Sequence, residues 1–250
     1  MQNKLIVKNI EVIYGKNGTK LKAVENLNFN VKENEFLCII GPSGCGKTTI
    51  LNTMAGFIKP TKGEISLNGI NIIKPSKEIG VVFQHNILFP WKTVKDNLII
   101  GPKINGVSKS KIRKISHYYL DLIGLEKYAN YYPNELSGGQ QQRVSFARAL
   151  ANNPEIILMD EPFSHLDAQT RAKLHYQLLQ ILNKHKKTII FVTHDIDEAL
   201  ILSDRILIMS KQPGKIKKEI KNNLPKPRTY KLTTEIGYTK QKKKIMNLLK

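Results

Sequence analysis

Nine consecutive residues in the first quarter of the chain have the types and the spacing of a phosphate-binding loop. They fit the pattern G-x-x-x-x-G-K-[ST] and run Gly41-Pro42-Ser43-Gly44-Cys45-Gly46-Lys47-Thr48-Thr49. Glycines let such a loop curl until successive backbone N–H groups point inward and form an anion nest. The lysine of this pattern reaches the β- and γ-phosphates, and the hydroxyl that follows it is placed to bind Mg²⁺. The loop therefore predicts binding of a nucleoside triphosphate together with Mg²⁺.

Two adjacent carboxylates follow a second apolar run. Residues 156–159 are Ile-Ile-Leu-Met, and Asp160 and Glu161 come directly after them, at the expected carboxyl end of a buried strand. Asp160 is suited to hold Mg²⁺ through water, because hard cations prefer oxygen ligands. Glu161 is then free to polarise an attacking water. An acidic surface turn is the alternative, and the phosphate loop earlier in the chain argues against it.

These residues are set in an alternation of strand and helix patterns. The loop itself stands between an apolar strand at residues 36–40 and a helix that continues through residues 50–56. Further strands are predicted at residues 79–83, 155–160, 188–193 and 205–209, and further helices at residues 140–151, 168–185 and 196–202. Near-continuous apolar strands that alternate with helices predict a parallel sheet covered on both faces.

The rest of the chain suggests two additional parts. Residues 5–14 and 23–31 are each predicted as an edge strand, and a short strand at residues 64–67 ends in an Asn-Gly hairpin signal. Between residues 85 and 154 the strand patterns stop and helical spacing takes over, most clearly at residues 110–125. We therefore expect a small antiparallel sheet and a helical lobe inserted into the α/β body.

The sequence has 250 residues, a net charge of +20 and two cysteines. Residues 211–250 contain thirteen Lys or Arg and two acids, so they carry +11 of that charge. Every apolar run is shorter than the roughly 18 residues that cross a bilayer, so we expect no membrane-spanning helix. Cys38, in a predicted strand, should be buried and inert, whereas we expect the Cys45 thiol in the loop to react with thiol reagents. We expect no disulfide between them, which fits a reducing cytoplasm.

A further motif makes the assignment specific. The run Leu136-Ser137-Gly138-Gly139-Gln140, together with the phosphate loop and Asp160-Glu161, resembles the nucleotide-binding domain of the ABC transporter family. Four more segments stand where that family has its motifs: Tyr14 at the adenine-stacking position, Gln84 at the Q-loop, Ser164-His165-Leu166-Asp167 at the D-loop and His194 at the switch histidine. The resemblance extends from residue 5 to residue 215, with the motifs in order.

The resemblance implies a fold and a domain organisation. The fold is that of an α/β P-loop NTPase, with a RecA-like parallel sheet core, a small antiparallel β-subdomain and an inserted helical subdomain. The ATPase domain should cover residues 1–215, with its core at 1–84 and 155–215 and its helical lobe at 85–154. Residues 216–250 should form a basic C-terminal tail.

The resemblance also implies cofactors and residue roles. ATP and Mg²⁺ are the expected cofactors, and ATP-binding residues are Tyr14, Gly41, Ser43, Gly44, Cys45, Gly46, Lys47, Thr48 and Thr49. Residues that reach the ATP of a second copy in a head-to-tail dimer are Ser137, Gly138, Gly139, Gln140 and Asp167. Mg²⁺ is expected on Thr48, Gln84 and Asp160, the last through water. Glu161, His194 and Gln84 are expected to be catalytic, although a histidine at a strand end is more often structural.

Residues 87–94, Ile-Leu-Phe-Pro-Trp-Lys-Thr-Val, are similar to a run in the nitrate, sulfonate and taurine group of ABC importers. This run either packs the core of the lobe or receives a cytoplasmic helix of a membrane subunit. The likeness implies an ATP-hydrolysing importer subunit for a small anionic or polar solute, at the cytoplasmic face of the membrane. Its partners would be permease subunits and an extracytoplasmic solute-binding protein, and we do not expect nucleic acid. An exporter ATPase and a soluble ABC ATPase of ribosomes or DNA repair are the alternatives.

The basic tail leaves two interpretations open. Four lysines lie beside four apolar residues: Lys240, Lys242, Lys243 and Lys244 beside Ile245, Met246, Leu248 and Leu249. The segment is either a solvated, frayed terminus or a short amphipathic turn that lies against the anionic inner leaflet.

Overall fold

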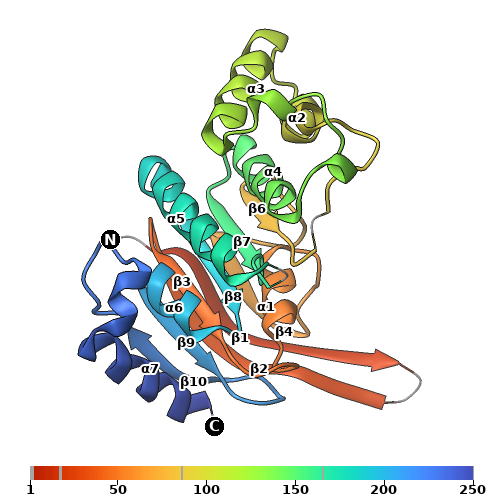
Figure 1. The fold of residues 1–250 in the computed structure, drawn as a ribbon. Helices are drawn as coiled ribbons and strands as arrows, with labels where there is room; N and C mark the ends of the chain where they lie inside the picture. The colour runs from red at the N-terminus through yellow and green to blue at the C-terminus, as the bar shows by residue number, and fades with distance from the viewer. Residues whose placement is uncertain (1–2, 17–18, 86, 165, 250) are drawn as a thin grey trace. The chain divides into compact units, whose positions relative to one another are not determined.

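The computed structural model describes residues 3–16, 19–85, 87–164 and 166–249. Strands and helices follow one another along the chain as Figure 1 shows. The chain forms two compact units, the first of Met1–Ser76, Leu158–Glu161 and Lys186–Lys250 and the second of Lys77–Ile157 and Pro162–His185. Among the described residues, none of the helices has both the length and the apolar character of a membrane span.

The first unit contains a four-stranded antiparallel sheet with the strand order β2-β1-β4-β5. Its strands are β1 (Asn3–Lys16), β2 (Thr19–Lys32), β4 (Lys62–Leu67) and β5 (Ile70–Asn71). The prediction of an edge strand at residues 5–14 is wrong, because β1 pairs with β2 on one side and with β4 on the other. The edge position of β2 and the β4–β5 hairpin are confirmed, and Asn68 and Gly69 have the positive φ angles, 50° and 80°, of a tight hairpin turn.

The second sheet of the first unit brings the ends of three strands together. Within this unit its order is β10-β9-β3-β8-β7. The strands are β3 (Phe36–Ile40), β7 (Ile156–Asp160), β8 (Thr188–Thr193), β9 (Arg205–Met209) and β10 (Ile216–Lys221). β3 runs parallel to both β8 and β9, so the segments that follow these strands emerge at one edge. All residues of β3, β7 and β8 are buried, as their apolar runs predicted.

The C-terminal segment is folded onto the first unit. β10 pairs antiparallel with β9, and η3 (Tyr230–Thr234) and α7 (Ile236–Leu249) follow it. α7 packs against β9 and against α6 (Ile196–Leu202) (Figure 1). The prediction of a solvated, frayed terminus is therefore wrong, because Tyr238 and Ile245, two turns apart on one helix face, are almost fully buried.

The second unit is largely helical. β6 (Ile79–Val82) lies beside the first residues of β7. The helices are α2 (Val94–Ile104), α3 (Lys109–Ile123), η1 (Glu126–Tyr128), η2 (Pro133–Glu135), α4 (Gly138–Ala151) and α5 (Ala168–His185). The helical spacing at residues 110–125 is confirmed by α3, and α5 has the predicted bounds. α4 packs against α2, α3 and α5, and α5 therefore belongs to the second unit.

The apolar run at residues 87–94 divides between core and surface. Leu88 and Val94 are buried, whereas Ile87 and Trp91 are 52% and 70% exposed. The interpretation that this run packs the core of the lobe is therefore correct for Leu88 and Val94 and wrong for Ile87 and Trp91.

One buried amide fixes the loop that carries Trp91. Asn97 of α2 is fully buried, and its Nδ2 donates to the carbonyl oxygens of Phe89, Lys92 and Thr93 at 3.0–3.2 Å. Its Oδ1 accepts the Phe89 N–H at 2.8 Å. A single side chain thus binds four backbone groups of this loop. Two of them, the carbonyls of Phe89 and Thr93, also accept backbone N–H groups, from Lys92 and Asn97.

Replacing Asn97 by alanine should lower the free energy of unfolding by about 1–3 kcal/mol, because the hydrogen bonds of a fully buried amide are lost. Urea unfolding of the full chain measures this as a lower transition midpoint. Asn105→Ala, an exposed asparagine at the end of the same helix, is the matched control. Equal midpoints for the two variants would contradict the role assigned to Asn97.

Candidate active site

Residues 41–46 form the loop between β3 and α1 (Lys47–Met54). Gly44 and Gly46 have φ angles of 75° and 94°, in the left-handed region that glycine adopts without a steric penalty. A Cβ on Gly46 would lie 2.5 Å from Val24 Cγ1, so glycine alone fits there. The loop runs directly into the first turn of α1, whose free N–H groups and dipole favour an anion. The backbone therefore has the shape of a phosphate nest.

The ammonium group of Lys47 is buried inside this loop. Its side chain is 6% exposed, and Nζ donates to the carbonyl oxygens of Gly41 and Pro42 at 2.9 and 3.0 Å. Glu161 Oε1 lies 4.0 Å from the same Nζ. Hydrogen bonds from an ammonium to phosphate oxygens are stronger than those to neutral carbonyls, so an incoming phosphate can displace the two carbonyl partners.

The thiol of Cys45 lies beneath the loop. Its side chain is 1% exposed, and a Cβ on Gly41 would come within 2.7 Å of its Sγ. Burial raises the pKa of the Cys45 thiol, and the neighbouring Lys47 charge opposes this only in part. The prediction that Cys45 reacts with thiol reagents is therefore wrong for the folded loop. Cys38 is buried and both thiols are free, as predicted.

Asp160 is the last residue of β7, and one oxygen of its buried carboxyl group has no hydrogen-bond donor beside it among the described residues. The residue is 5% exposed, the Thr48 hydroxyl hydrogen-bonds to its carboxyl, and Oδ1 has no hydrogen-bond partner among the described residues. Burial raises the pKa of the Asp160 carboxyl, and the adjacent Glu161 charge adds to the shift. A buried carboxylate oxygen beside a threonine hydroxyl suits Mg²⁺, which prefers oxygen ligands. Among the described residues, no group of three or more His, Cys, Asp or Glu is placed to hold a metal ion.

Glu161 and His194 meet at the ends of β7 and β8. His194 Nδ1 lies 2.8 Å from Glu161 Oε2, a hydrogen-bond distance. Glu161 has a φ of 41°, which is uncommon outside glycine, and its N–H donates to the Val192 carbonyl at 2.9 Å. This backbone turn aims one carboxylate oxygen at His194 and the other at Lys47. The His194 side chain is 62% exposed, so a ligand can reach the imidazole.

Tyr14 of β1 reaches the same group of residues. Its hydroxyl donates to Thr49 Oγ1 at 3.2 Å, and its side chain is partly exposed. An aromatic ring in this position can stack on a nucleotide base. The first unit therefore brings together Tyr14, residues 41–49, Asp160, Glu161 and His194.

The Ser-Gly-Gly run lies in the second unit, where it starts α4. Ser137 Oγ accepts the Gln140 N–H at 3.3 Å, and Gln140 Oε1 accepts the Ser137 N–H at 2.8 Å. This reciprocal pair is a capping box, and it fixes the first turn of the helix. Ser137 and Gly138 are exposed, so the start of α4 is a second helix end that can receive an anion.

The remaining predicted residues also belong to the second unit. Gln84 follows β6 and is half-buried. Asp167 precedes α5, and its Oδ1 accepts the Thr170 N–H at 2.9 Å, which lowers the pKa of the Asp167 carboxyl. His165, within the run predicted as the D-loop, lies outside the described residues.

Two residues that flank His194 fix its backbone and were not predicted. Thr193 Oγ1 accepts the Asp195 N–H at 3.0 Å and donates to Glu198 Oε2 at 2.5 Å. Asp195 Oδ1 accepts the N–H groups of Asp197 and Glu198 at 2.7 and 3.2 Å and so caps α6. The sequence does contain the signal, because Asp195 followed three residues later by Glu198 is the spacing of a helix N-terminus.

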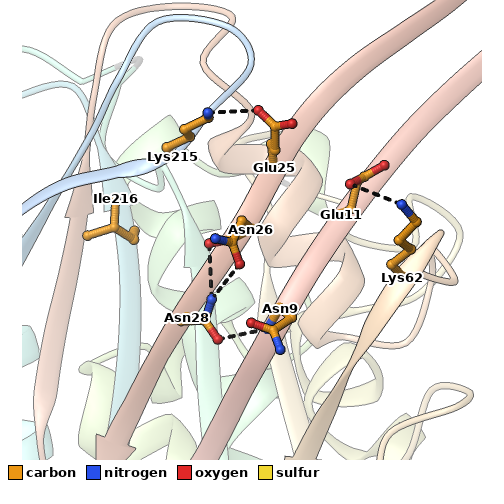
Figure 2. Close-up of a pocket in the computed structure, with 8 residues that line it drawn as sticks. All are labelled: Asn9, Glu11, Glu25, Asn26, Asn28, Lys62, Lys215 and Ile216. Atoms are coloured by element: carbon orange, nitrogen blue, oxygen red, sulfur yellow. Dashed lines mark hydrogen bonds and ion pairs between the residues drawn. The ribbon is translucent and has the colours of Figure 1, made fainter.

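A separate cavity of about 700 Å³ lies on the antiparallel sheet (Figure 2). It is lined by Asn9, Glu11, Glu25, Asn26, Asn28, Lys62, Lys215 and Ile216. Its charges pair with one another, since Lys215 Nζ lies 2.8 Å from Glu25 and Lys62 Nζ lies 3.8 Å from Glu11. Charges that neutralise each other attract a ligand weakly, so the phosphate loop remains the candidate site.

Comparison with known proteins identifies the family. The family model described as ABC transporter matches residues 24–164. An uncharacterized ABC transporter ATP-binding protein of Methanocaldococcus jannaschii is 48% identical over 100% of this chain and 92% of its own length. The nitrate import ATP-binding protein NrtD of Synechocystis is 41% identical over 96% of this chain and 92% of its own. The dimeric, post-hydrolysis structure of the ATP-binding cassette MJ0796, bound to ADP and Pi, has a TM-score of 0.76 and 37% identity and covers 88% of this chain and 100% of that one.

These similarities confirm the predicted fold class and the predicted activity. The solved cassette shares the P-loop α/β fold at an identity well above chance, and it was captured with the products of ATP hydrolysis. The relatives match this chain over nearly its whole length and theirs. The chain belongs to the ABC transporter family, and it is an ATP-binding and ATP-hydrolysing member of that family.

Proposed function

We propose that this chain is the ATPase subunit of a membrane importer and that two copies close head to tail around two ATP molecules. The observation that carries the proposal is the convergence of Lys47, Asp160, Glu161 and His194 at one edge of the parallel sheet. The chain also has a second exposed helix start, at Ser137. Two anion sites in one chain are what a composite site shared between two copies requires, and such a pair closes with twofold symmetry.

In the proposed reaction Glu161 acts as the general base. It takes a proton from water while the resulting hydroxide attacks the γ-phosphorus and the bond to the ADP oxygen breaks. His194 holds the Glu161 carboxylate by their 2.8 Å contact and presents its imidazole to the γ-phosphate. Lys47 binds the β- and γ-phosphate oxygens in place of its two carbonyl partners, which neutralises the charge that develops on them.

Mg²⁺ would be held by Thr48, Gln84 and Asp160, the last through water. The buried Asp160 Oδ1, unpaired among the described residues, supports this assignment. When bound, Mg²⁺ neutralises charge on the phosphate oxygens. The Tyr14 ring would stack on the adenine.

The other half of each site would come from the second copy. Ser137 Oγ and the backbone N–H groups of Gly138 and Gly139 would bind the γ-phosphate, with Gln140 and Asp167 beside them. The exposure of Ser137 and Gly138 supports this, because the start of α4 is open to a partner. The similar cassette bound to ADP and Pi is itself dimeric.

The transported solute is proposed to be small and anionic or polar. The likeness to a nitrate import ATP-binding protein supports import. The chain would then work at the cytoplasmic face of the membrane, bound to permease subunits, and an extracytoplasmic solute-binding protein would deliver the solute to them.

The exposed side chains of Ile87 and Trp91 are the proposed contact with the permease. Both are large apolar groups more than half exposed. The Asn97 hydrogen bonds make their loop rigid, which reduces the entropy lost when it binds a helix.

Replacing Glu161 by glutamine should preserve ATP binding and slow hydrolysis by at least about 10²-fold, because the amide cannot accept the proton. An ATP-bound dimer should then accumulate. Phosphate release measures the rate, and size-exclusion chromatography with ATP measures the dimer. Glu64→Gln, on the exposed face of β4, is the control. Turnover by the Glu161 variant near the wild-type rate would show that another group is the base.

Replacing Trp91 by alanine should leave the ATPase activity of the isolated protein unchanged and weaken binding to the permease subunits. Loss of a central tryptophan at an interface costs about 2 kcal/mol or more, or roughly 30-fold in affinity. Co-purification with the permease subunits in detergent measures the effect. Ile104→Ala, which removes another exposed apolar side chain of the same unit, should bind normally. If both variants bind equally well, Trp91 is not part of the contact.

A further inference from the structure

Two side chains of α7 converge on one carboxylate at the start of α6. The Tyr238 hydroxyl donates to Asp197 Oδ1 at 2.6 Å. Lys242 Nζ lies 2.7 Å from Asp197 Oδ1 and 2.8 Å from Oδ2. Tyr238 is 2% exposed, so its hydroxyl has been removed from water to make this contact. The first turn of α6 is therefore tied to α7 by polar bonds as well as by packing.

The other end of α6 is held by the segment between β10 and α7. Asn222 Nδ2 donates to the carbonyl oxygens of Leu200 and Ser203, both at 2.8 Å, and an Arg228 guanidinium nitrogen donates to Ser203 at 2.8 Å. Asn222 and Arg228 are both buried. The last carbonyls of a helix have no partner within the helix, so these bonds cap α6 at its C-terminal end.

α6 in turn fixes the position of His194. The helix begins two residues after His194, and the residues on both sides of that histidine, Thr193 and Asp195, bond to its first turn. Asp195 Oδ1 accepts the N–H of Asp197, the residue whose side chain α7 holds. A shift of the first turn would move His194 relative to Glu161.

We propose that the C-terminal segment positions His194 for catalysis: Tyr238 and Lys242, acting through Asp197, keep His194 within hydrogen-bond distance of Glu161. This inference rests on the proposed role of His194 in hydrolysis. A helix that served stability alone could pack through Ile245 and other apolar groups. Here the buried Tyr238 hydroxyl and the Lys242 ammonium both bind the Asp197 carboxylate, in the helical turn that follows His194. Tyr238 and Lys242 are positioning residues, because they act on the reaction through α6.

The test compares Tyr238→Phe and Lys242→Met with Lys243→Met in the full-length chain. The first keeps the buried ring, the second keeps the aliphatic stem, and Lys243 is an exposed lysine of the same helix. Steady-state kinetics give kcat and the KM for ATP, and NMR of protein labelled with [¹⁵N]histidine reports the imidazole of His194, assigned with His194→Ala. We expect both test variants to lower kcat about threefold or more at unchanged KM and to shift the His194 resonances. Lys243→Met should change neither.

Two further variants separate positioning from general stability. Lys242→Arg, which keeps a cation where Lys242→Met removes it, should have the wild-type kcat. In the His194→Ala background Tyr238→Phe should have no additional effect on kcat, because the two changes act on one step. The inference is overturned if Tyr238→Phe and Lys242→Met leave the His194 resonances as in Lys243→Met, or if Tyr238→Phe lowers kcat equally in both backgrounds.

The same experiment distinguishes this inference from the proposed role of His194. Wild-type hydrolysis by His194→Ala alone would refute that role, whereas the NMR shifts would still show whether α7 holds the histidine. Should Tyr238→Phe fail to fold, Lys242→Met still tests the inference through kcat and the His194 resonances.

Discussion

The buried ammonium of Lys47 is the interaction on which the rest of the site depends. A buried charge must be matched by groups of opposite polarity, and here two loop carbonyls and the Glu161 carboxylate supply them. That arrangement requires a loop that curls tightly enough to bring the Gly41 and Pro42 carbonyls to Nζ. It also requires a strand of the same sheet that ends in acids, and β7, separated from β3 by β8, is that strand. The parallel sheet meets the second requirement, because its strand ends lie at one edge. A phosphate entering this site finds a positive charge already in place.

Much of this arrangement could be predicted from the sequence because its signals are local. The apolar run at residues 36–40 and the loop motif predicted β3 and α1. The predicted bounds of β8, β9 and α5 are the bounds that the structure shows. Asp160 and Glu161, at the carboxyl end of β7, were predicted as functional acids from their place directly after an apolar run. The hydrogen bond between Glu161 and His194 depends on how separate strands are placed, and neither residue alone specifies it.

What could not be predicted depends on contacts between distant parts of the chain. The inner position of β1 comes from its pairing with β4, for which residues 5–14 carry no signal. The loop motif specifies the backbone path but not the direction of the Cys45 side chain, which points under the loop. At the C-terminus the many lysines suggested a solvated segment, although Tyr238 and Ile245 lie on one face of a helix. Only the contact of α7 with α6 shows that this face is buried.

The central claim is that each ATP site combines Lys47 of one copy with Ser137 of the other, and a mixing experiment tests it most directly. Phosphate release is measured for Lys47→Ala, for Ser137→Arg and for an equal mixture of the two, all at the same total concentration. A composite site predicts little hydrolysis by either variant alone. The mixture should regain activity, because a heterodimer contains one site with both residues intact. A mixture no more active than the mean of the two separate variants would contradict the account.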